Sequence, residues 1–529
     1  MKIFFAALLV AASAAVVAAP ARHARPPRAE AAKKAEASQP QKPFFTPGEV
    51  HSTGTLTLHG QPIAYDAVAG TLVVHAKDWE DTDALDADQS DDKDKDARKP
   101  EASMFYTAYF QQGAPAAARP ITFLFNGGPG SSTMWLHMGS FGPMKVDASQ
   151  PETIPGPPFR YVANPDTLLD ISDLVFIDAP TTGLSRLLGK TENKDVMGVD
   201  KDIDVFTKTI QRYLTKYQRW NSPKFIIGES YGTTRAAGLS DSLANAGVQL
   251  NGVAFISTVF NFADFQGDQS LVNFLPTYAA DAWYHGKIAS KPPLEGFIQQ
   301  AREFASGAYA SALQKGGTIS DAEKQSVARR MSELTGLSTD YIVRSNLRVD
   351  PGRFRRELLR DRHQIIGRID SRYIGTEPDT VGEAADYDPQ ASAITGAFVG
   401  ALNDYLLRDL GYRTPLTYRP NNYAETGGGN WSFQHKSPDG PQPIADTSSD
   451  LADAMRQNPR MKVLSVSGLY DLATPFGGAD YEFHHMALEP QIAANIRYTY
   501  YEAGHMMYID PQSARQLKAD LSAFYASAQ

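Results

Sequence analysis

Short runs of β-branched and aromatic residues alternate with helical stretches from residue 120 onward, and this alternation restricts the fold more than any other feature. Such runs are typical of buried parallel strands. Between two of them, segment 202–217 carries apolar residues at helical spacing. The pattern predicts an α/β fold with a mostly parallel central sheet, helices on both faces, and an active site at the carboxyl ends of the strands. The runs are 121–125, 174–177, 224–227, 253–256 and 462–466.

The stretch 284–449 breaks this rhythm with amphipathic helical patterns and irregular Gly-, Asn- and Pro-rich sequence, after which the strand pattern resumes. We therefore predict a mainly helical cap at 284–449, inserted into a domain whose two parts are 48–283 and 450–529. In the first part, two alternating segments predict short antiparallel strands at 54–59 and 70–75.

Three features of the charge distribution could be given a functional interpretation, but each is better explained without one. The acidic run at 78–99 is typical of a solvated loop rather than a cation site. Within the predicted cap, Arg368, Asp370 and Arg372 indicate a solvated ion pair that adds little stability. The net charge of −9 argues against nucleic acid as a partner, because nucleic-acid binders present basic surfaces.

The N-terminus has the pattern of an export signal. Lys2 precedes an apolar run and small residues suited to cleavage, which predicts a signal peptide at 1–21 followed by a Pro- and Ala-rich tether at 22–47. A membrane anchor is the alternative, but the run is shorter than the ~20 residues that a bilayer requires. Because the chain has no cysteine, it forms no disulfides, and a bacterial periplasm or secretion is the predicted location, with no membrane attachment after cleavage.

A nucleophile motif follows the strand predicted at 224–227. Gly228, Ser230 and Gly232 form G-x-S-x-G between a strand and a helix, where a tight turn exposes the serine hydroxyl above the sheet. A serine hydroxyl needs a base that is oriented by a carboxylate, and in α/β-hydrolases these follow in the order serine, acid, histidine. Asp471 and His505 each follow a predicted strand in this order.

A glycine-rich turn after the strand 121–125 completes the predicted site. Developing negative charge on a tetrahedral oxyanion requires two backbone N–H donors, one from the residue after the nucleophile, Tyr231. The second is expected from the turn that begins at Asn126 and includes Gly128. A phosphate-binding function fits this turn poorly, because it lacks the lysine and the glycine spacing of phosphate loops.

Four motifs together resemble the serine carboxypeptidase family, peptidase family S10, in a bacterial exported form. They are Asn126-Gly-Gly-Pro-Gly-Ser-Ser, Gly228-Glu-Ser-Tyr-Gly232, Asp471 with Thr474-Pro475, and Gly504-His505. The resemblance implies an α/β-hydrolase fold and hydrolysis of C-terminal residues from peptide substrates, with no metal and no organic cofactor.

The resemblance also implies a role for each matching residue. Ser230 matches the nucleophile, His505 the general base and Asp471 its orienting carboxylate; Gly128 and Tyr231 match the oxyanion donors. Asn126 and Glu229 match groups that bind the substrate's C-terminal carboxylate.

Because two ionised carboxylates repel, Glu229 must be protonated to bind a C-terminal carboxylate, which predicts activity favoured at acidic pH. Two positions depart from the family pattern. Ser140 stands where a second carboxylate-binding glutamate is usual, and Ser131 replaces a common cysteine.

Two alternatives stay open on sequence grounds. One is an esterase or another serine peptidase on the same fold, in which Glu229 recognises a different group. The other is a catalytically inactive binding protein. A metal-dependent hydrolase is disfavoured because the chain has no H-E-x-x-H motif and its histidines do not cluster at ligand spacing. The oligomeric state is not predicted.

Overall fold

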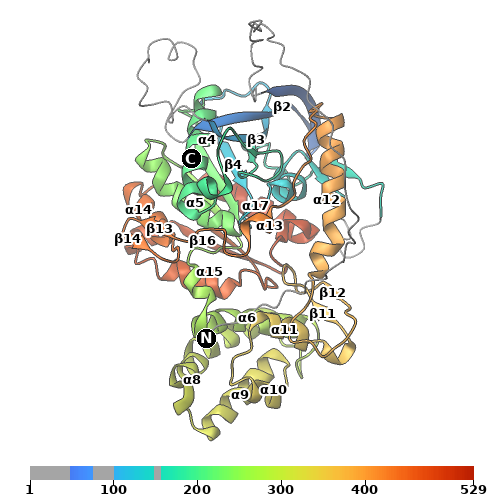
Figure 1. Ribbon diagram of the computed structural model, residues 1–529, viewed down its shortest axis with the longest axis vertical. Coiled ribbons are helices and arrows are strands. Elements are labelled where there is room, and N and C mark those ends of the chain that lie inside the picture. Colours follow the sequence, from blue (N-terminus) through green and yellow to red (C-terminus); the bar gives the residue numbers. More distant parts are fainter. Residues whose placement is uncertain (1–47, 76–99, 148–155, 529) are drawn as a thin grey trace, which may run out of the picture. The chain divides into compact units, whose positions relative to one another are not determined.

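A mostly parallel sheet runs through the part of the chain that the computed structural model describes, residues 48–75, 100–147 and 156–528 (Figure 1). Its strands lie in the order β1-β2-β3-β7-β4-β9-β10-β15-β16, and β8 pairs with β3. The strands from β7 to β16 pair in parallel, whereas β1, β2 and β3 pair antiparallel. Their bounds are β1 (Glu49–Leu58), β2 (Gln61–His75), β3 (Pro100–Gln111), β4 (Ile121–Phe125), β7 (Asp173–Ile177), β8 (Arg186–Leu187), β9 (Lys224–Glu229), β10 (Gly252–Ile256), β15 (Lys462–Gly468) and β16 (Ile496–Tyr501).

All five runs predicted as parallel strands are central strands of this sheet. The two predicted N-terminal segments belong to a longer hairpin, β1 and β2, and β3 pairs beside it without having been predicted. The predicted signal peptide, tether and acidic loop lie outside the described residues.

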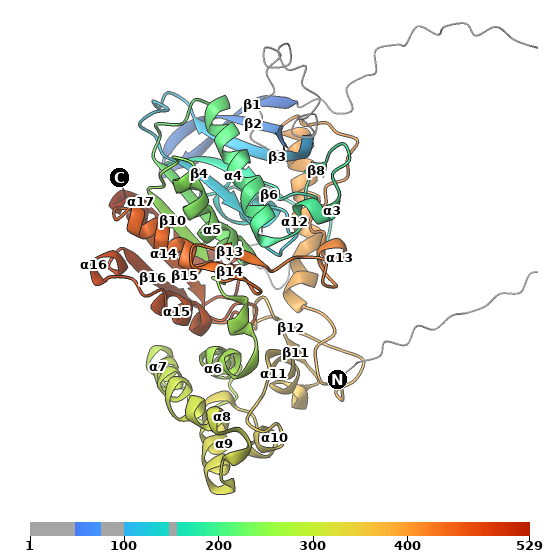
Figure 2. The ribbon, with the colours of Figure 1, turned by 60° about the vertical axis from the view of Figure 1, so that its left-hand side comes forward.

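Alternate residues of the central strands enter two apolar layers, one on each face of the sheet. On β4, Phe123 and Phe125 pack with α4, α5 and α14, whereas Leu124 packs with α12 and α17. This alternation follows from the two-residue period of a strand. Figure 2 shows α4 and α5 side by side against the strands. The bounds are α4 (Val199–Lys216), α5 (Tyr231–Asn245), α12 (Pro389–Arg408), α14 (Ser448–Gln457) and α17 (Pro511–Ser527).

The insertion between β10 and β15 has two parts that pack differently. Helices α6 to α11 lie together below the sheet in Figure 1, and they pack with Leu472 in an apolar cluster that we call the cap cluster. Helix α12 instead buries Ile394 and Phe398 in the layer that α17 also joins. The insertion thus differs from the predicted cap 284–449 at both ends, because α6 begins at Gly267 and α12 covers the sheet. The cap helices are α6 (Gly267–Tyr284), α7 (Leu294–Phe304), α8 (Ala310–Lys315), α9 (Asp321–Thr335), α10 (Thr339–Arg344) and α11 (Pro351–Glu357).

No helix in the described ranges is long and apolar enough to cross a membrane.

Short elements connect the layers of the fold. They are α2 (Met134–Leu136), β5 (Met144–Val146), β6 (Tyr161–Ala163), α3 (Asn193–Val196), β11 (Ile365–Ile366), β12 (Ile374–Gly375), α13 (Tyr423–Thr426), β13 (His435–Ser437), β14 (Gly440–Gln442), α15 (Phe476–His484) and α16 (Pro490–Ala493).

Candidate active site

The sequence-predicted site residues lie at the carboxyl ends of neighbouring strands. Asn126 follows β4, Ser230 follows β9, Asp471 follows β15 and His505 lies beyond the end of β16. These strands and β10 are adjacent in the sheet, in the order β4-β9-β10-β15-β16. Because parallel strands end at the same edge, residues more than 370 positions apart in the chain are collected there.

Ser230 lies in a sharp turn between β9 and α5. Its φ of 59° and ψ of −132° are unusual for a residue with a side chain, and its N–H donates to Ile256 O at 2.9 Å. Gly228 is required in this turn, because a Cβ there would lie 2.2 Å from Gly232 O. Strained backbone of this kind persists only where the surrounding structure enforces it, and it often marks functional positions. Ser230 is half-buried, so its side chain retains access to solvent.

Asp471 is completely buried and accepts several hydrogen bonds. Its Oδ1 accepts from the N–H groups of Ala473 and Thr474 at 2.7 and 2.9 Å, and its Oδ2 accepts from Thr474 Oγ1 at 2.8 Å. The Oδ2 atom also lies 2.7 Å from His505 Nδ1. These contacts hold the carboxylate in one orientation toward the imidazole.

The environment of His505 contains opposing influences. Burial lowers the pKa of His505, but the charge of Asp471 and its hydrogen bond outweigh burial and leave that pKa above its ordinary value. The charge of Glu229 acts in the same direction on the pKa of His505, and the charge of Arg368 opposes it. The imidazolium is therefore stabilised in the site.

The end of β10 connects the three loops. Ser257 Oγ donates to His505 O at 2.8 Å, and Thr474 Oγ1 donates to Ser257 O at 3.1 Å. The preceding residue, Ile256, accepts the N–H of Ser230. Adjacent residues of one strand end are thus bonded to the serine, acid and histidine loops.

The glycine-rich turn lies directly against the N-terminus of α5. A Cβ on Gly127 would lie 2.4 Å from the backbone nitrogens of both Tyr231 and Gly232, so a larger residue does not fit. Gly128 has a φ of +110°, which residues with side chains rarely adopt. The turn therefore brings the backbone of Gly127 close to the backbone nitrogen of Tyr231.

Glu229, Asn126 and Tyr508 provide the polar groups beside the serine. Tyr508 donates its hydroxyl proton to Glu229 Oε1 at 2.9 Å, and burial raises the pKa of Glu229 to about 7. Asn126 Oδ1 accepts from Leu136 N, and the buried Asn126 side chain also interacts with the Tyr508 hydroxyl.

One of the two residues that depart from the family pattern does not face these groups with its hydroxyl. Ser140 is buried and donates to Leu136 O at 2.7 Å. The hydroxyl is therefore occupied within its own helical turn.

Sequence reasoning missed Tyr508 and misjudged the charges of the insertion. Tyr508 has no motif of its own, and only its position three residues after His505 offered a signal. The predicted solvated pair in the cap is wrong: Asp370 is 3% exposed and binds Arg372 through both oxygens. Its burial results from contact with the His505 loop, which sequence spacing does not reveal.

The described residues contain no group of three or more His, Asp or Glu side chains arranged to hold a metal ion.

Residues 95–291 match the model of the serine carboxypeptidase family, which covers Asn126, Glu229 and Ser230 but ends before Asp471 and His505. A search of curated proteins found no match.

Among solved structures, the chain is similar to Kex1(Δ)p, a prohormone-processing carboxypeptidase from Saccharomyces cerevisiae. The two are 13% identical with a TM-score of 0.53, covering 87% of this chain and 91% of that one. An α/β hydrolase, MGS-M2, from a Medee basin deep-sea metagenome library is 10% identical with a TM-score of 0.33, covering 80% and 94%. The chain has the α/β-hydrolase fold, with the mostly parallel sheet and flanking helices that the sequence predicts.

Proposed function

We propose that this protein is an exported serine carboxypeptidase, which removes C-terminal residues from peptides through an acyl-enzyme on Ser230. The observation that carries the proposal is the buried Asp471–His505 pair, 2.7 Å apart, at the strand ends next to the strained turn of Ser230. The family match over residues 95–291 supports the class of reaction.

Acylation begins when Ser230 Oγ attacks the carbonyl carbon of the last peptide bond. His505 Nε2 accepts the hydroxyl proton, because Nδ1 is engaged by Asp471. The backbone N–H groups of Gly128 and Tyr231 stabilise the oxyanion. His505 then gives its proton to the leaving nitrogen, the C–N bond breaks and the C-terminal residue departs. Water, deprotonated by His505, hydrolyses the ester by the same steps in reverse order.

Asn126 and Glu229 are the residues that would make the enzyme prefer substrates with a free C-terminus. The buried amide of Asn126, which also contacts the Tyr508 hydroxyl, can donate to the substrate carboxylate, and protonated Glu229 supplies a second donor. Because Glu229 and His505 interact electrostatically, a proton on one disfavours a proton on the other. Binding of an anionic C-terminus favours the proton on Glu229, which leaves His505 neutral and able to act as a base.

Export to a bacterial periplasm or to the medium is also part of the proposal. It rests on the N-terminal pattern of residues 1–21 and on the absence of cysteine from the chain. The N-terminal sequence of the mature protein, recovered from a periplasmic fraction, tests it: a chain that still begins at Met1 would contradict cleavage.

The activity is tested with one N-blocked dipeptide, offered with a free and an amidated C-terminus from pH 4 to 8. We expect cleavage of the free acid, strongest below pH 7 where Glu229 is protonated, and a loss of at least about a thousandfold in Ser230→Ala. Equal cleavage of both forms would support the esterase or general peptidase alternative. The Ser140 hydroxyl agrees with that alternative, because it bonds to Leu136 O and is not free to bind a C-terminal carboxylate. Absence of both cleavage and labelling by an organophosphonate would indicate an inactive binding protein.

A further inference from the structure

Residues 367–372, which we call the strap, lie between β11 and β12 in the insertion and contact both loops of the acid–base pair. Three backbone hydrogen bonds make this contact: Leu472 N–H donates to Arg368 O at 3.0 Å, Ser371 N–H to Tyr470 O at 3.0 Å, and His505 N–H to Ile369 O at 2.7 Å. The strap is thus bonded to His505 itself and to both neighbours of Asp471.

A buried side chain adds a fourth contact. Asp370 Oδ2 accepts the N–H of Gly504, the residue before His505, at 3.0 Å. The fit is close, because a Cβ on Gly504 would lie 2.4 Å from Ile369 O and 2.5 Å from Asp370 Cα. The His505 loop therefore cannot shift toward the strap, and Asp370 restrains it from moving away.

Arg372 completes this restraint. Its Nε lies 3.0 Å from Asp370 Oδ1 and its Nη2 lies 2.7 Å from Asp370 Oδ2, while its Nη1 donates to Glu502 O at 2.7 Å. The side chains of Asp370 and Arg372 are 4% and 15% exposed. The pair binds the His505 loop at two points, Glu502 and Gly504, from a low-dielectric environment where such bonds are strong.

The strap is itself anchored at both ends. Asp388 Oδ2 accepts the N–H groups of Arg368 and Ile369 at 2.5 and 3.1 Å, and Ser371 Oγ bonds to the buried Asp281 of α6. Arg355 donates to Ile366 O and Tyr387 O at 3.1 and 2.8 Å, which ties the strap's start to the segment that carries Asp388.

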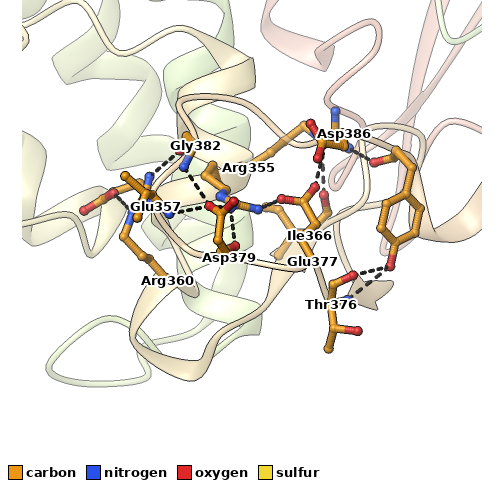
Figure 3. Close-up of polar contacts among 12 residues, drawn as sticks. Arg355, Glu357, Arg360, Ile366, Thr376, Glu377, Asp379, Gly382 and Asp386 are labelled. Carbon is orange, nitrogen blue, oxygen red and sulfur yellow. Dashed lines mark hydrogen bonds and ion pairs between the residues drawn. The ribbon is translucent and has the colours of Figure 1, made fainter.

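Figure 3 shows the polar network around Arg355. In it, Glu377 accepts the N–H of Asp386 at 2.6 Å.

We infer that Asp370 is a positioning residue for the proposed reaction: by holding Gly504 and, through Arg372, Glu502, it fixes the imidazole of His505 against Asp471. The inference rests on the proposed function. Asp370 touches no reacting atom, and it acts through the loop that delivers the general base. A base displaced by about 1 Å loses on the order of a hundredfold in rate, so restraint of this loop has a kinetic consequence.

The ionisation of His505 provides a direct readout. Asp471 and Glu229 raise the pKa of His505, and Arg368 lowers it. Asp370 itself faces Arg372, and its charge also acts on Asp281 and His285. When Asp370 becomes asparagine, the His505 loop loosens and its contact with Asp471 weakens. Arg372 then keeps only Asp510, whose Oδ2 lies 3.5 Å from Nη1, as a nearby counter-charge among the described residues. Both changes lower the pKa of His505.

The test compares Asp370→Asn with Asp268→Asn, the same change in the more exposed two-point Arg348–Asp268 pair of the insertion, which, in the described part of the chain, does not contact the acid and histidine loops. Rates are expressed per active site titrated with an organophosphonate, and histidine ionisation is followed by NMR with ¹⁵N-labelled histidine. We expect kcat to fall about 10- to 100-fold in Asp370→Asn with little change in KM, and the titration of His505 to move to lower pH. Asp268→Asn should change neither.

A second variant keeps the inference testable if Asp370→Asn alone does not fold. Asp370→Asn combined with Arg372→Gln replaces the ion pair by two neutral amides. We expect the titration of His505 to move in the same direction, because the loop still loses its restraint, but by less, because the charge of Arg372 is also gone. An unchanged kcat per titrated site with an unchanged His505 titration would overturn the inference, and so would loss of the fold in both variants. If the unaltered protein neither cleaves peptides nor reacts with organophosphonate, the proposed function fails, while the NMR titration still decides whether Asp370 positions His505.

Discussion

At the scale of single residues, Glu229 and His505 are two buried titratable groups that interact electrostatically. Burial raises the pKa of Glu229 to about 7, and the positive charge of protonated His505 lowers it. In turn, ionised Glu229 raises the pKa of His505. The two groups therefore titrate as a coupled pair, and the proposed activity needs the state in which Glu229 holds the proton.

Replacing Glu229 by glutamine should alter both limbs of the pH profile for free-acid peptides. Glutamine cannot ionise, so the decline in kcat/KM as pH rises through about 7 should disappear. Removal of the negative charge lowers the pKa of His505, so the acidic limb should move to lower pH. The measurement is kcat/KM from pH 4 to 9.

Glu482→Gln is the matched control, because Glu482 is also completely buried with its pKa raised to about 8, yet it bonds to the backbone of residues 260 and 261. It should keep the alkaline limb of the unaltered protein. A Glu229→Gln enzyme with that same alkaline limb would contradict the role assigned to Glu229.

At the scale of elements, the strand–turn–helix unit of β9 and α5 depends on the absence of side chains where backbones meet. A Cβ on Gly228 would lie 2.2 Å from Gly232 O, and one on Gly127 would lie 2.4 Å from Tyr231 N. Close contacts between backbones leave no flexible group to move aside. The glycines of the motif are therefore requirements of packing, from which the exposure of Ser230 follows.

Gly228→Ala should destabilise the protein by about 1–3 kcal/mol or more, since the added methyl group must displace backbone. Gly296→Ala in α7 is the comparison, because a Cβ there meets no atom within 4 Å and alanine favours a helix by up to about 1 kcal/mol. Urea unfolding of both variants measures the difference. Equal stability of the two variants would refute the packing argument.

A second inter-element contact joins β13 to α4 and α14 through His435. Its Nδ1 lies 2.6 Å from Asp200 and its Nε2 lies 2.9 Å from Asp450. Burial lowers the pKa of His435, but the two carboxylates outweigh burial and raise that pKa to about 9.

The raised pKa of His435 makes stability depend on pH. With a folded-state pKa of about 9 and an ordinary value of 6.5, the stabilisation is complete below pH 6.5 and is lost as pH rises through 9. In His435→Gln, the free energy of unfolding should be lower at pH 6 and should change less between pH 6 and 9 than in the unaltered protein. Urea titrations at several pH values test this, with the exposed His484→Gln as control.

At the scale of the whole molecule, the cap cluster includes the residue next to Asp471. Leu472 directly follows Asp471, is 1% exposed and packs in the cap cluster. Together with the strap, this contact means that the insertion supports the loops of Asp471 and His505 from the side opposite the sheet ends. Stability of the cap and geometry of the site are therefore coupled.

Leu472→Ala should lower the free energy of unfolding by about 2–5 kcal/mol and also lower kcat, because the cavity lies beside the Asp471 loop. Leu334→Ala removes an equally buried leucine of the same cluster, on α9, and should cost similar stability without changing kcat per titrated site. Urea unfolding and active-site titration separate the two effects. A normal kcat in Leu472→Ala would show that the cap and the site are independent.

The amino-acid sequence determined by itself the features that depend on local pattern. The runs around Phe123 and Ile226 predict buried strands because a strand covered on both faces is apolar along most of its length, and the glycines around Ser230 predict the turn because no side chain fits. Order along the chain then predicted Asp471 and His505 as the acid and the base, and they lie at the same edge of the sheet because parallel strands end there.

Only the tertiary structure decided which distant side chains become buried together. Tyr508 reaches Glu229, and Asp370 is buried against Gly504, although neither residue belongs to a local pattern that indicates this. The division of the insertion has the same origin, since Phe398 joins the sheet layer and Leu472 the cap cluster by long-range packing. The charge and hydrogen bonding of a group depend on what surrounds it in space, and spacing along the chain does not specify those surroundings.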